Sequence, residues 1–321
     1  MKTYLVSVVI PLYNAASTLN RCVDSLMTQT LESIEYIFVD DCSTDDTVRV
    51  LQEALARYPQ RQSDVQILTS PEHQGTLAAR LRGMQAAQGE FITQCDGDDY
   101  VEPGAYATAY GVAQIRNADI VIFNYYLERG KQRTVVNRVL PYSTGNEVIA
   151  TGYLTLIEWG VVLMMMRNDH EAITRIRPIA SRQITMWEDV YLCMHLFRGA
   201  QQVSYIDEPL YHYDVSRKRR ILPIEAMHDC IAVATEVSTL LADDPAMDIE
   251  RHWLEFVAKE QLLVHGTIAQ WRATFPECHR YIGQFKGLNR RQRIVYSCLA
   301  HGFTWPYRAQ EWVKHNLLHR K

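Results

Sequence analysis

The amino-acid sequence predicts an α/β fold, with a mostly parallel central sheet flanked by helices and a C-terminal helical region. Over the first hundred residues, short β-branched, apolar runs alternate with helical patterns of apolar residues. Such alternation implies right-handed βαβ crossovers and a parallel sheet. From Glu225 onward only the helical pattern continues. We therefore expect an α/β domain over residues 1–222 and a helical region over residues 223–321.

The strands are expected where apolar runs end in turn residues or polar loops. These runs are Val6–Ile10, which stops at Pro11, and then Ile34–Val39, Val65–Leu68, Glu90–Cys95 and Asp119–Asn124. Helical faces are formed by Leu19, Cys22, Val23 and Leu26, by Val48, Leu51 and Leu55, and by Leu77, Leu81 and Met84. Ser43 with Asp46 has the spacing of a capping box at the start of the second of these helices. Residues 133–140 predict a β-ribbon, and the three methionines 164–166 predict core packing.

The composition is that of an ordinary globular chain, with 321 residues, 47% of them hydrophobic and 22% charged. A net charge of -4 gives no sign of nucleic-acid binding, so no nucleic-acid partner is expected. No apolar run approaches the roughly 20 residues needed to span a bilayer, and Met1–Tyr4 leads directly into the first strand. Seven cysteines without paired metal-ligand spacing fit a reducing compartment. We expect a cytoplasmic protein.

An acidic cluster, Asp96-Gly97-Asp98-Asp99, follows the expected strand Glu90–Cys95. Carboxylates at the end of a buried strand are costly unless a positive charge lies beside them. A divalent cation such as Mg²⁺ or Mn²⁺, shared with a diphosphate, is the natural partner of such hard oxygen ligands. In an α/β sheet this edge is where ligands bind. The alternative is an acidic surface loop that caps the next element.

Two further strands end in polar loops at the same edge of the expected sheet. Pro11-Leu12-Tyr13-Asn14 brings an aromatic ring, which can stack on a base. Asp40–Asp46 brings carboxylates, which can accept a hydrogen bond from a base N–H or a ribose hydroxyl. These loops favour a nucleotide site.

Six motifs in order resemble the family 2 inverting glycosyltransferases of the GT-A fold, of the bacterial surface-polysaccharide type. They are Val8–Asn14, Val39–Asp45, Gly75 with Ala79-Arg80, Gly89–Ile92, Asp96–Asp99 and Trp187-Glu188-Asp189. The resemblance covers about two thirds of the chain and implies a GT-A-like sheet. It implies a metal-dependent hexosyl- or N-acetylhexosaminyl-transferase that uses a nucleotide-diphosphate sugar, with UDP as the expected carrier. The acceptor would be a hydroxyl of a glycan or a lipid-linked glycan in cell-surface polysaccharide synthesis.

The resemblance also assigns roles at the nucleotide. Asp98 is expected to bind the metal directly, and Asp99 to bind the metal or the acceptor. Asp96 is expected to meet the ribose, and Asp41 to read the base. Pro11 and Tyr13 would lie against the base. Arg80 matches a nucleotide-site arginine, and its alternative is a solvated helix residue.

The pair Glu188-Asp189 is the expected catalytic pair. The resemblance places the general base at the second acid, Asp189, with Glu188 poised beside it. The alternative is that both acids begin the helix Val190–Phe197, where acidic residues are favoured. The two interpretations are compatible.

The segment Pro209–Tyr213 matches a tyrosine-rich strand of the family. Its His212 is a candidate ligand for the metal or a phosphate, and the alternative is a hydrogen-bonded structural histidine. Asp214 stands where the family usually carries a basic residue, and the run Arg217–Arg220 is the expected source of that charge. Gln74 before Gly75 and the pair Val161-Val162 also depart from the family pattern.

The end of the chain, residues 286–321, contains eight Lys and Arg but one acid, Glu311. Aromatic residues are interleaved with these charges: Tyr296, Phe303, Trp305, Tyr307 and Trp312. This composition is typical of an interfacial membrane contact, for which we expect a peripheral location on the inner face of the cytoplasmic membrane. The alternative is that these aromatics pack within the fold or against a second copy in a homodimer.

Other classes fit the sequence less well. A sugar-phosphate nucleotidyltransferase would need a glycine-rich phosphate loop after the first strand, where Val9–Asn14 has no glycine. A dinucleotide-dependent oxidoreductase lacks its glycine motif for the same reason. A phospho-receiver domain would be shorter. A catalytically inactive sugar-nucleotide-binding subunit stays open as an alternative.

Overall fold

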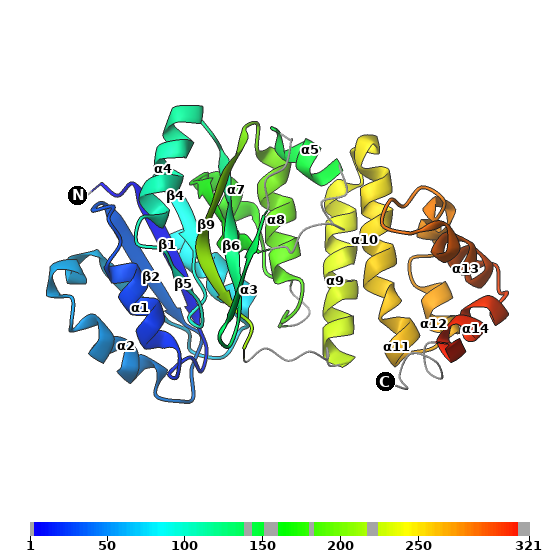
Figure 1. Ribbon diagram of the computed structural model, residues 1–321, viewed down its shortest axis with the longest axis horizontal. Coiled ribbons are helices and arrows are strands. Elements are labelled where there is room, and N and C mark those ends of the chain that lie inside the picture. The colour runs from blue at the N-terminus through cyan, green and yellow to red at the C-terminus, as the bar shows by residue number, and fades with distance from the viewer. Residues whose placement is uncertain (1–2, 138–142, 151–159, 180–182, 217–223, 314–321) are drawn as a thin grey trace. The chain divides into compact units, whose positions relative to one another are not determined.

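The computed structural model describes residues 3–137, 143–150, 160–179, 183–216 and 224–313 (Figure 1). The chain forms two compact units. The first comprises Met1–Val148 and Glu158–Ile221, and the second comprises Ile149–Ile157 and Leu222–Lys321. The boundary expected after residue 222 lies next to this division, whereas the segment that starts at Ile149 belongs to the second unit and not to the expected first domain.

The first unit is built on one mixed sheet. Its strands are β1 (Val6–Leu12), β2 (Ile34–Asp40), β3 (Val65–Thr69), β4 (Phe91–Gln94), β5 (Tyr100–Val101), β6 (Ile120–Arg129), β7 (Gln132–Val136), β8 (Met164–Arg167) and β9 (Val203–Asp214). Their order is β3-β2-β1-β4-β8-β6-β9-β5, with β7 paired to β6. Strands β1 to β4 are parallel, and β8 runs antiparallel between β4 and β6. The α/β prediction is confirmed, and antiparallel strands extend its parallel core.

Helices cover both faces of this sheet. The helices of the first unit are α1 (Leu19–Met27), α2 (Thr47–Leu55), α3 (Thr76–Ala86), α4 (Ala105–Arg116), α7 (His170–Arg175) and α8 (Glu188–Gly199), with 3₁₀ turns η1 (Pro59–Asp64) and η2 (Val161–Leu163). Helix α5 (Gly145–Ala150) crosses the boundary between the two units. Figure 1 shows α1 and α2 on one face and α3 and α8 on the other. Right-handed crossovers produce this arrangement when the strand order reverses between β1 and β4. The polar loops after β1, β2 and β4 are thereby brought to one edge.

The core of the first unit follows the apolar runs. Strand β2 is buried along its whole length, as expected for a parallel strand covered on both faces. Met164, Met165 and Met166 are buried, which confirms that they pack in the core.

Two local predictions need correction. Strand β1 does not stop at Pro11 but continues to Leu12, and both residues pair with β2. The pairing of β1 with β4 ends at Val9, so Pro11 lies where β1 has a partner strand on one side only. The capping box at α2 is wrong: a carboxylate oxygen of Asp45 accepts the hydrogen bond from Thr47 N at 2.9 Å. The Ser43 hydroxyl instead accepts from Asn14 N and joins the loops after β1 and β2.

The expected β-ribbon is present as the antiparallel pair β6–β7. Its last predicted residues, 138–140, lie outside the described residues.

The second unit is helical, as predicted. It contains α9 (Ile224–Leu241), α10 (Asp248–Glu260), α11 (Leu262–His265), α12 (Ile268–Ala273), α13 (Arg290–Ala300) and α14 (Trp305–Val313), with 3₁₀ turns η3 (Pro245–Met247) and η4 (Pro276–Tyr281). Phe256, Trp271, Phe285 and Leu299 belong to its own buried core. Among the described residues, no helix is long and apolar enough to cross a membrane.

Candidate active site

A cavity of about 420 Å³ opens where the loops after β1, β2 and β4 meet α3 and α8. The residues that line it are Pro11, Leu12, Tyr13, Asn14, Ala15, Ser17, Thr18, Asp41, Thr76, Ala79, Arg80, Asp96, Gly97, Asp98 and Glu188. The structure thus brings together most of the residues predicted for the nucleotide and the metal. Asp99, Asp189 and His212 are predicted site residues that are not among the lining residues.

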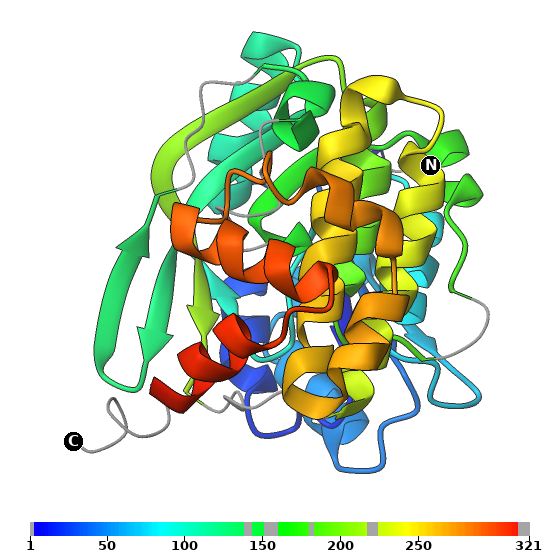
Figure 2. The same cartoon turned by 90° about the vertical axis from the view of Figure 1, so that its right-hand side faces the viewer.

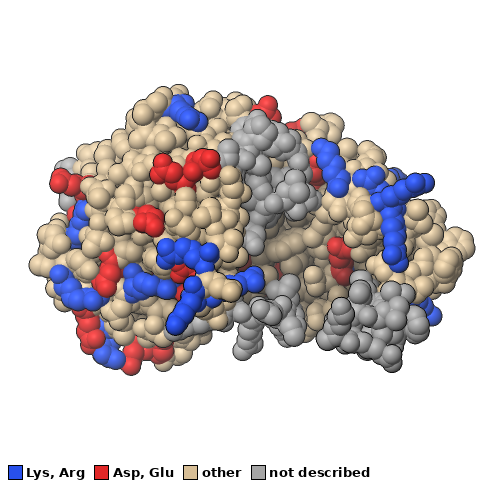
Figure 3. All heavy atoms as spheres, in the orientation of Figure 1, with Lys and Arg blue, Asp and Glu red and all other residues tan. Residues whose placement is uncertain are grey.

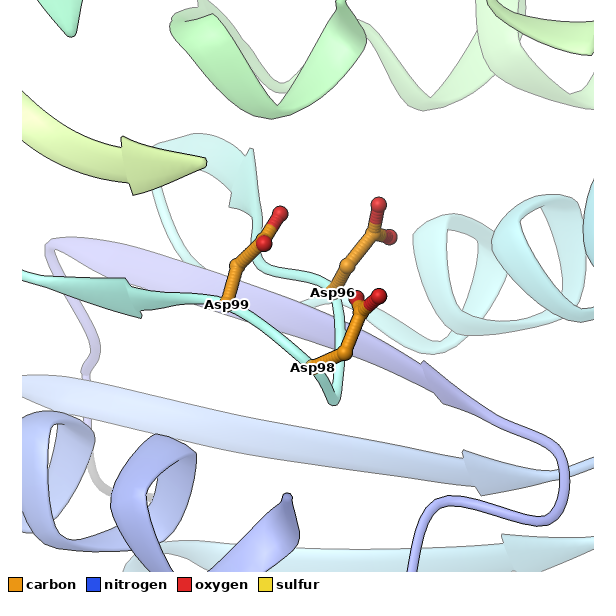
Figure 4. Close-up of side chains that lie close together, drawn as sticks. All are labelled: Asp96, Asp98 and Asp99. Atoms are coloured by element: carbon orange, nitrogen blue, oxygen red, sulfur yellow. The ribbon is translucent and has the colours of Figure 1, made fainter. Parts of the chain in front are cut away.

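The acidic cluster lies in the loop between β4 and β5. Asp96, Asp98 and Asp99 each offer a carboxylate oxygen within 4.8 Å of the others (Figure 4). Gly97 packs closely against the end of β1: a Cβ at this position would lie 2.6 Å from Leu12 Cδ2, so the leucine side chain would have to shift.

The three carboxylates have different surroundings. Asp99 is fully buried, and its oxygens accept hydrogen bonds from Tyr211 Oη at 2.8 Å and from Asp214 N at 2.9 Å. Asp99 thus joins the acidic loop to β9. Asp98 is partly exposed and lines the cavity, so it is better placed than Asp99 to meet a metal.

Arg80 is buried beneath the cavity and bridges several site residues. Its Nη1 donates to Gln94 Oε1 at 2.8 Å, and its Nη2 donates to Asp96 at 2.8 Å. The same Nη2 lies 3.7 Å from Asp189 Oδ1. Burial alone would lower the pKa of this guanidinium, but the carboxylates of Asp96, Asp189 and Glu188 hold it above its ordinary value. Arg80 is therefore not a solvated helix residue.

Glu188 and Asp189 form the first turn of α8, as the helix-start interpretation predicted. The preceding Trp187 has a φ of 65°, an unfavourable backbone conformation for a bulky residue. Such local strain often accompanies functional sites. Burial raises the pKa of Glu188 to about 8; the neighbouring Asp189 adds to the shift and Arg80 opposes it. At neutral pH Glu188 therefore holds its proton.

Asp41 organises the opposite end of the cavity. It is buried, and it accepts hydrogen bonds from Gln74 N at 2.9 Å and Gly75 N at 2.7 Å. Gly75 has a φ of +91°, which favours glycine. The carboxylate thereby shapes the loop that precedes α3.

His73 is a site residue that the sequence analysis missed. Its ring stacks on Tyr13 with a centroid distance of 3.9 Å, and its Nδ1 lies 2.8 Å from Asp41 Oδ2. Tyr13 is 45% exposed, so part of its ring stays open to the cavity. No local spacing marks His73, because its contacts come from loops distant in the sequence.

Arg21 of α1 was also missed. It donates to the carbonyl of Asp98 at 3.0 Å and to Asp214 at 2.8 Å. Burial acts to raise the pKa of Asp214, but hydrogen bonds from Ser216 and Arg21 outweigh it and hold the pKa at about 2. Asp214, in place of the family's basic residue, thus anchors a cation from α1. Residues 217–220, the expected basic run, lie outside the described residues.

His212 is not part of the carboxylate cluster. Its Nδ1 lies 3.0 Å from Glu128 and its Nε2 lies 2.9 Å from Glu102. The ring is stacked between Tyr100 and Tyr126 at centroid distances of 4.0 and 4.7 Å. Both nitrogens thus face carboxylates away from the cluster, which favours the structural alternative.

Residues 7–174, which supply almost all of the cavity, match the family described as Glycosyl transferase family 2. The chain belongs to this family, and the resemblance drawn from its motifs is confirmed. The fold class is confirmed as well: the chain is similar in fold to the crystal structure of S. aureus TarS 1–349 in complex with UDP. That similarity has a TM-score of 0.65 at 18% identity and covers 97% of this chain and 91% of that one.

Curated relatives carry glycosyltransferase names. The uncharacterized glycosyltransferase EpsJ of Bacillus subtilis (strain 168) is 31% identical over 215 residues, which cover 65% of this chain and 60% of EpsJ. The cholesterol galactosyltransferase of Borreliella burgdorferi is 29% identical over 221 residues, which cover 65% of this chain and 59% of that protein. The matched region thus spans about 60% of the length of these relatives.

Proposed function

We propose that the protein transfers a sugar, with inversion, from a UDP-sugar to a hydroxyl of a glycan or lipid-linked acceptor in cell-surface polysaccharide synthesis. One observation carries the proposal. A single cavity joins an aromatic ring and a buried carboxylate, Tyr13 and Asp41, to the acidic pair Asp96 and Asp98 and to the start of α8 at Glu188. These are the groups needed for a base, a diphosphate and an attacking hydroxyl.

The proposed donor class rests on the end of the cavity near Tyr13 and Asp41, where a nucleotide base can bind. The exposed part of the Tyr13 ring can stack on a planar base, and Asp41 can accept from a base N–H. TarS, which shares the fold, has been crystallised with UDP and with UDP-GlcNAc. A uridine diphosphate sugar is accordingly the donor class proposed for this chain.

Mg²⁺ or Mn²⁺ is the cofactor proposed at the acidic cluster. The residues fit a hard cation, because Asp96 and Asp98 present carboxylate oxygens within reach of one another at the cavity wall. Asp98 would hold the ion, with Asp96 oriented by Arg80. When bound, the ion would neutralise the charge that develops on the leaving diphosphate.

Asp189 is proposed as the general base that removes the proton of the acceptor hydroxyl. Glu188 holds its own proton at neutral pH and cannot accept another, so Asp189 is the member of the pair assigned as the base. The Arg80 guanidinium lies 2.8 Å from Asp96 and 3.7 Å from Asp189, so it links the two carboxylates. The deprotonated hydroxyl would attack the anomeric carbon opposite the departing diphosphate and invert its configuration.

The acceptor and the location complete the proposal. The names of two relatives, cholesterol galactosyltransferase and the chondroitin synthase of Escherichia coli, indicate lipid and polysaccharide acceptors in this family. No disulfide joins any of the seven cysteines, and we propose the reducing cytoplasm as the compartment where the nucleotide sugar meets the enzyme.

A screen of nucleotide-sugar donors for hydrolysis and transfer tests this function. We expect turnover of one UDP-sugar that requires Mg²⁺ or Mn²⁺. Donor binding without hydrolysis or transfer to any offered glycan would favour the inactive sugar-nucleotide-binding subunit. Formation of a nucleotide sugar from a sugar phosphate and UTP would favour the nucleotidyltransferase.

A further inference from the structure

Two helices near the end of the chain present basic and apolar side chains together on their exposed faces. Helices α13 and α14 pack against each other on the side of α10 away from α9 (Figures 1 and 2). On α13, Val295 and Leu299 are buried, and Leu299 belongs to the core of the second unit. The opposite faces are therefore available to a partner.

On α13 the exposed face combines charge with an aliphatic side chain. Arg290, Arg291 and Ile294 are exposed, and their spacing of three and four residues places them on one side of the helix. Ile294 is 56% exposed. Within the described part of the chain, neither arginine takes part in an ion pair.

On α14 and the turn before it, aromatic side chains are exposed. Phe303 is 62% and Trp305 is 72% exposed, and Arg308 follows Trp305 by three residues on the same side of α14. Tyr296 and Tyr307 instead pack against the core of the second unit. The expectation that the aromatics pack within the fold thus holds for these two tyrosines and not for Phe303 or Trp305.

The segment that contains α13 and most of α14 carries only positive charges on its side chains. Residues 286–310 contain five Lys and Arg and no Asp or Glu. On the second unit, the face visible in Figure 3 likewise carries more basic than acidic side chains. Exposed apolar side chains grouped with arginines mark a surface that binds a partner, and they suit a partner with a negatively charged surface and an apolar layer beneath it.

We infer that this surface, formed by Arg290, Arg291, Ile294, Phe303, Trp305 and Arg308, binds the headgroup region of an anionic lipid bilayer. The arginines meet lipid phosphates, the indole of Trp305 lies at the headgroup level, and Ile294 and Phe303 enter the acyl boundary. A second copy of the chain would have to place like charges against each other across a two-fold interface, so the lipid surface is the better complement. The inference does not depend on the sugar donor.

Vesicle flotation with the full chain tests the inference. Wild type should float with vesicles of phosphatidylcholine and phosphatidylglycerol at low salt, less at high salt, and weakly with phosphatidylcholine alone. Arg290→Glu with Arg291→Glu should weaken binding at least about tenfold, because each basic residue near an anionic surface contributes to affinity. Phe303→Ser with Trp305→Ser should weaken it comparably and remain weak at low salt.

A matched control reverses two arginines elsewhere. Arg49 and Arg280 are exposed and already paired with acids, so Arg49→Glu with Arg280→Glu should float like wild type. UDP binding, measured on each variant, separates loss of lipid contact from loss of fold or donor site.

Three results would overturn the inference. Wild type could stay at the bottom with anionic vesicles at low salt, or both surface variants could float as well as the control. Light scattering could also show a dimer, with no lipid binding, that Phe303→Ser with Trp305→Ser dissociates; the surface would then be a self-association interface.

Discussion

The Nη2 atom of Arg80 donates a 2.8 Å hydrogen bond to Asp96, and the same atom lies 3.7 Å from Asp189. One buried cation therefore connects a carboxylate of the acidic loop with the carboxylate proposed as the general base. Gln94 holds the other arm of the guanidinium. The same guanidinium thus contacts carboxylates on the donor side and on the acceptor side of the proposed site.

Replacing Arg80 should damage stability, donor binding and transfer together. Arg80→Met leaves two partly buried carboxylates, Asp96 and Asp189, without their cation. Removing one partner of a fully buried pair typically costs about 3–5 kcal/mol, and the melting temperature should fall by an amount that approaches this cost. Arg80→Lys keeps the charge but cannot reach Gln94 and Asp96 with two nitrogens, so it should fold while transfer falls. Thermal melts and initial rates measure both effects. An Arg80→Lys enzyme with wild-type rates would contradict this role.

The two acids at the start of α8 should behave differently. Asp189→Asn keeps the shape of the side chain but cannot accept a proton, so transfer should fall about 10²-fold or more while UDP affinity changes little. Glu188→Gln reproduces the neutral state that Glu188 holds below pH about 8, so it should stay active at neutral pH. If Asp189→Asn transfers normally, the base lies elsewhere.

The same pair predicts a pH dependence of UDP binding. Above pH about 8, wild-type Glu188 ionises and adds a negative charge to the cavity, so affinity for UDP should decline. The Glu188→Gln variant lacks this charge and should show no such decline. Titration calorimetry at several pH values compares the two proteins, and parallel pH profiles would contradict the assignment.

Tyr13 and His73 should form the platform for the base. Tyr13→Ala removes the stacking ring, and loss of base stacking typically costs about 1–3 kcal/mol, so UDP should bind about 5- to 150-fold more weakly. His73→Ala should weaken UDP less, because the Tyr13 ring remains. Binding of pyrophosphate, which has no base, should be unchanged in both variants. Equal losses for UDP and pyrophosphate would indicate a general disturbance of the loops.

Glu250 should make the unfolding free energy depend on pH. Burial raises the pKa of this α10 residue to about 7 from an ordinary 4.5, with Lys286 opposing the shift. Between these values the native state holds a proton that the unfolded state releases, so stability falls as pH rises from about 4.5 to 7. Glu250→Gln should remove this decline in thermal melts, whereas Glu277→Gln at an exposed ion pair should not. An unchanged slope in Glu250→Gln would refute the shift.

The sheet and the position of the acidic cluster could be predicted because both follow from local patterns. Val6–Ile10 and Ile34–Val39 read as buried strands, and parallel connectivity requires their loops to meet Asp96–Asp99 at one edge. The antiparallel insertion of β8 between β4 and β6 could not be predicted, since pairing of distant short strands leaves no local pattern.

Side-chain partners across the fold were the least predictable part. Arg80 lies on α3, and its position along the helix does not show which residues it will contact. Its partners in the structure are Gln94, Asp96 and Asp189. The sequence made His212 a candidate ligand for the metal or a phosphate, yet its two ring nitrogens face Glu102 and Glu128. The partners of a histidine or arginine depend on which carboxylates the topology of the fold brings near it. The spacing of residues along the chain does not predict those partners.

Metal-dependent binding of UDP tests the account most directly. Asp96 and Asp98 repel the diphosphate unless a cation lies between them, so UDP should raise the melting temperature in Mn²⁺ and have little effect in chelator. At about 100 times its Kd, a ligand contributes about 2.7 kcal/mol of stability, which a thermal shift resolves. Asp98→Asn should lose most of this response, while Asp46→Asn on the exposed start of α2 should keep it. Equal stabilisation of wild type by UDP in Mn²⁺ and in chelator would contradict the central claim.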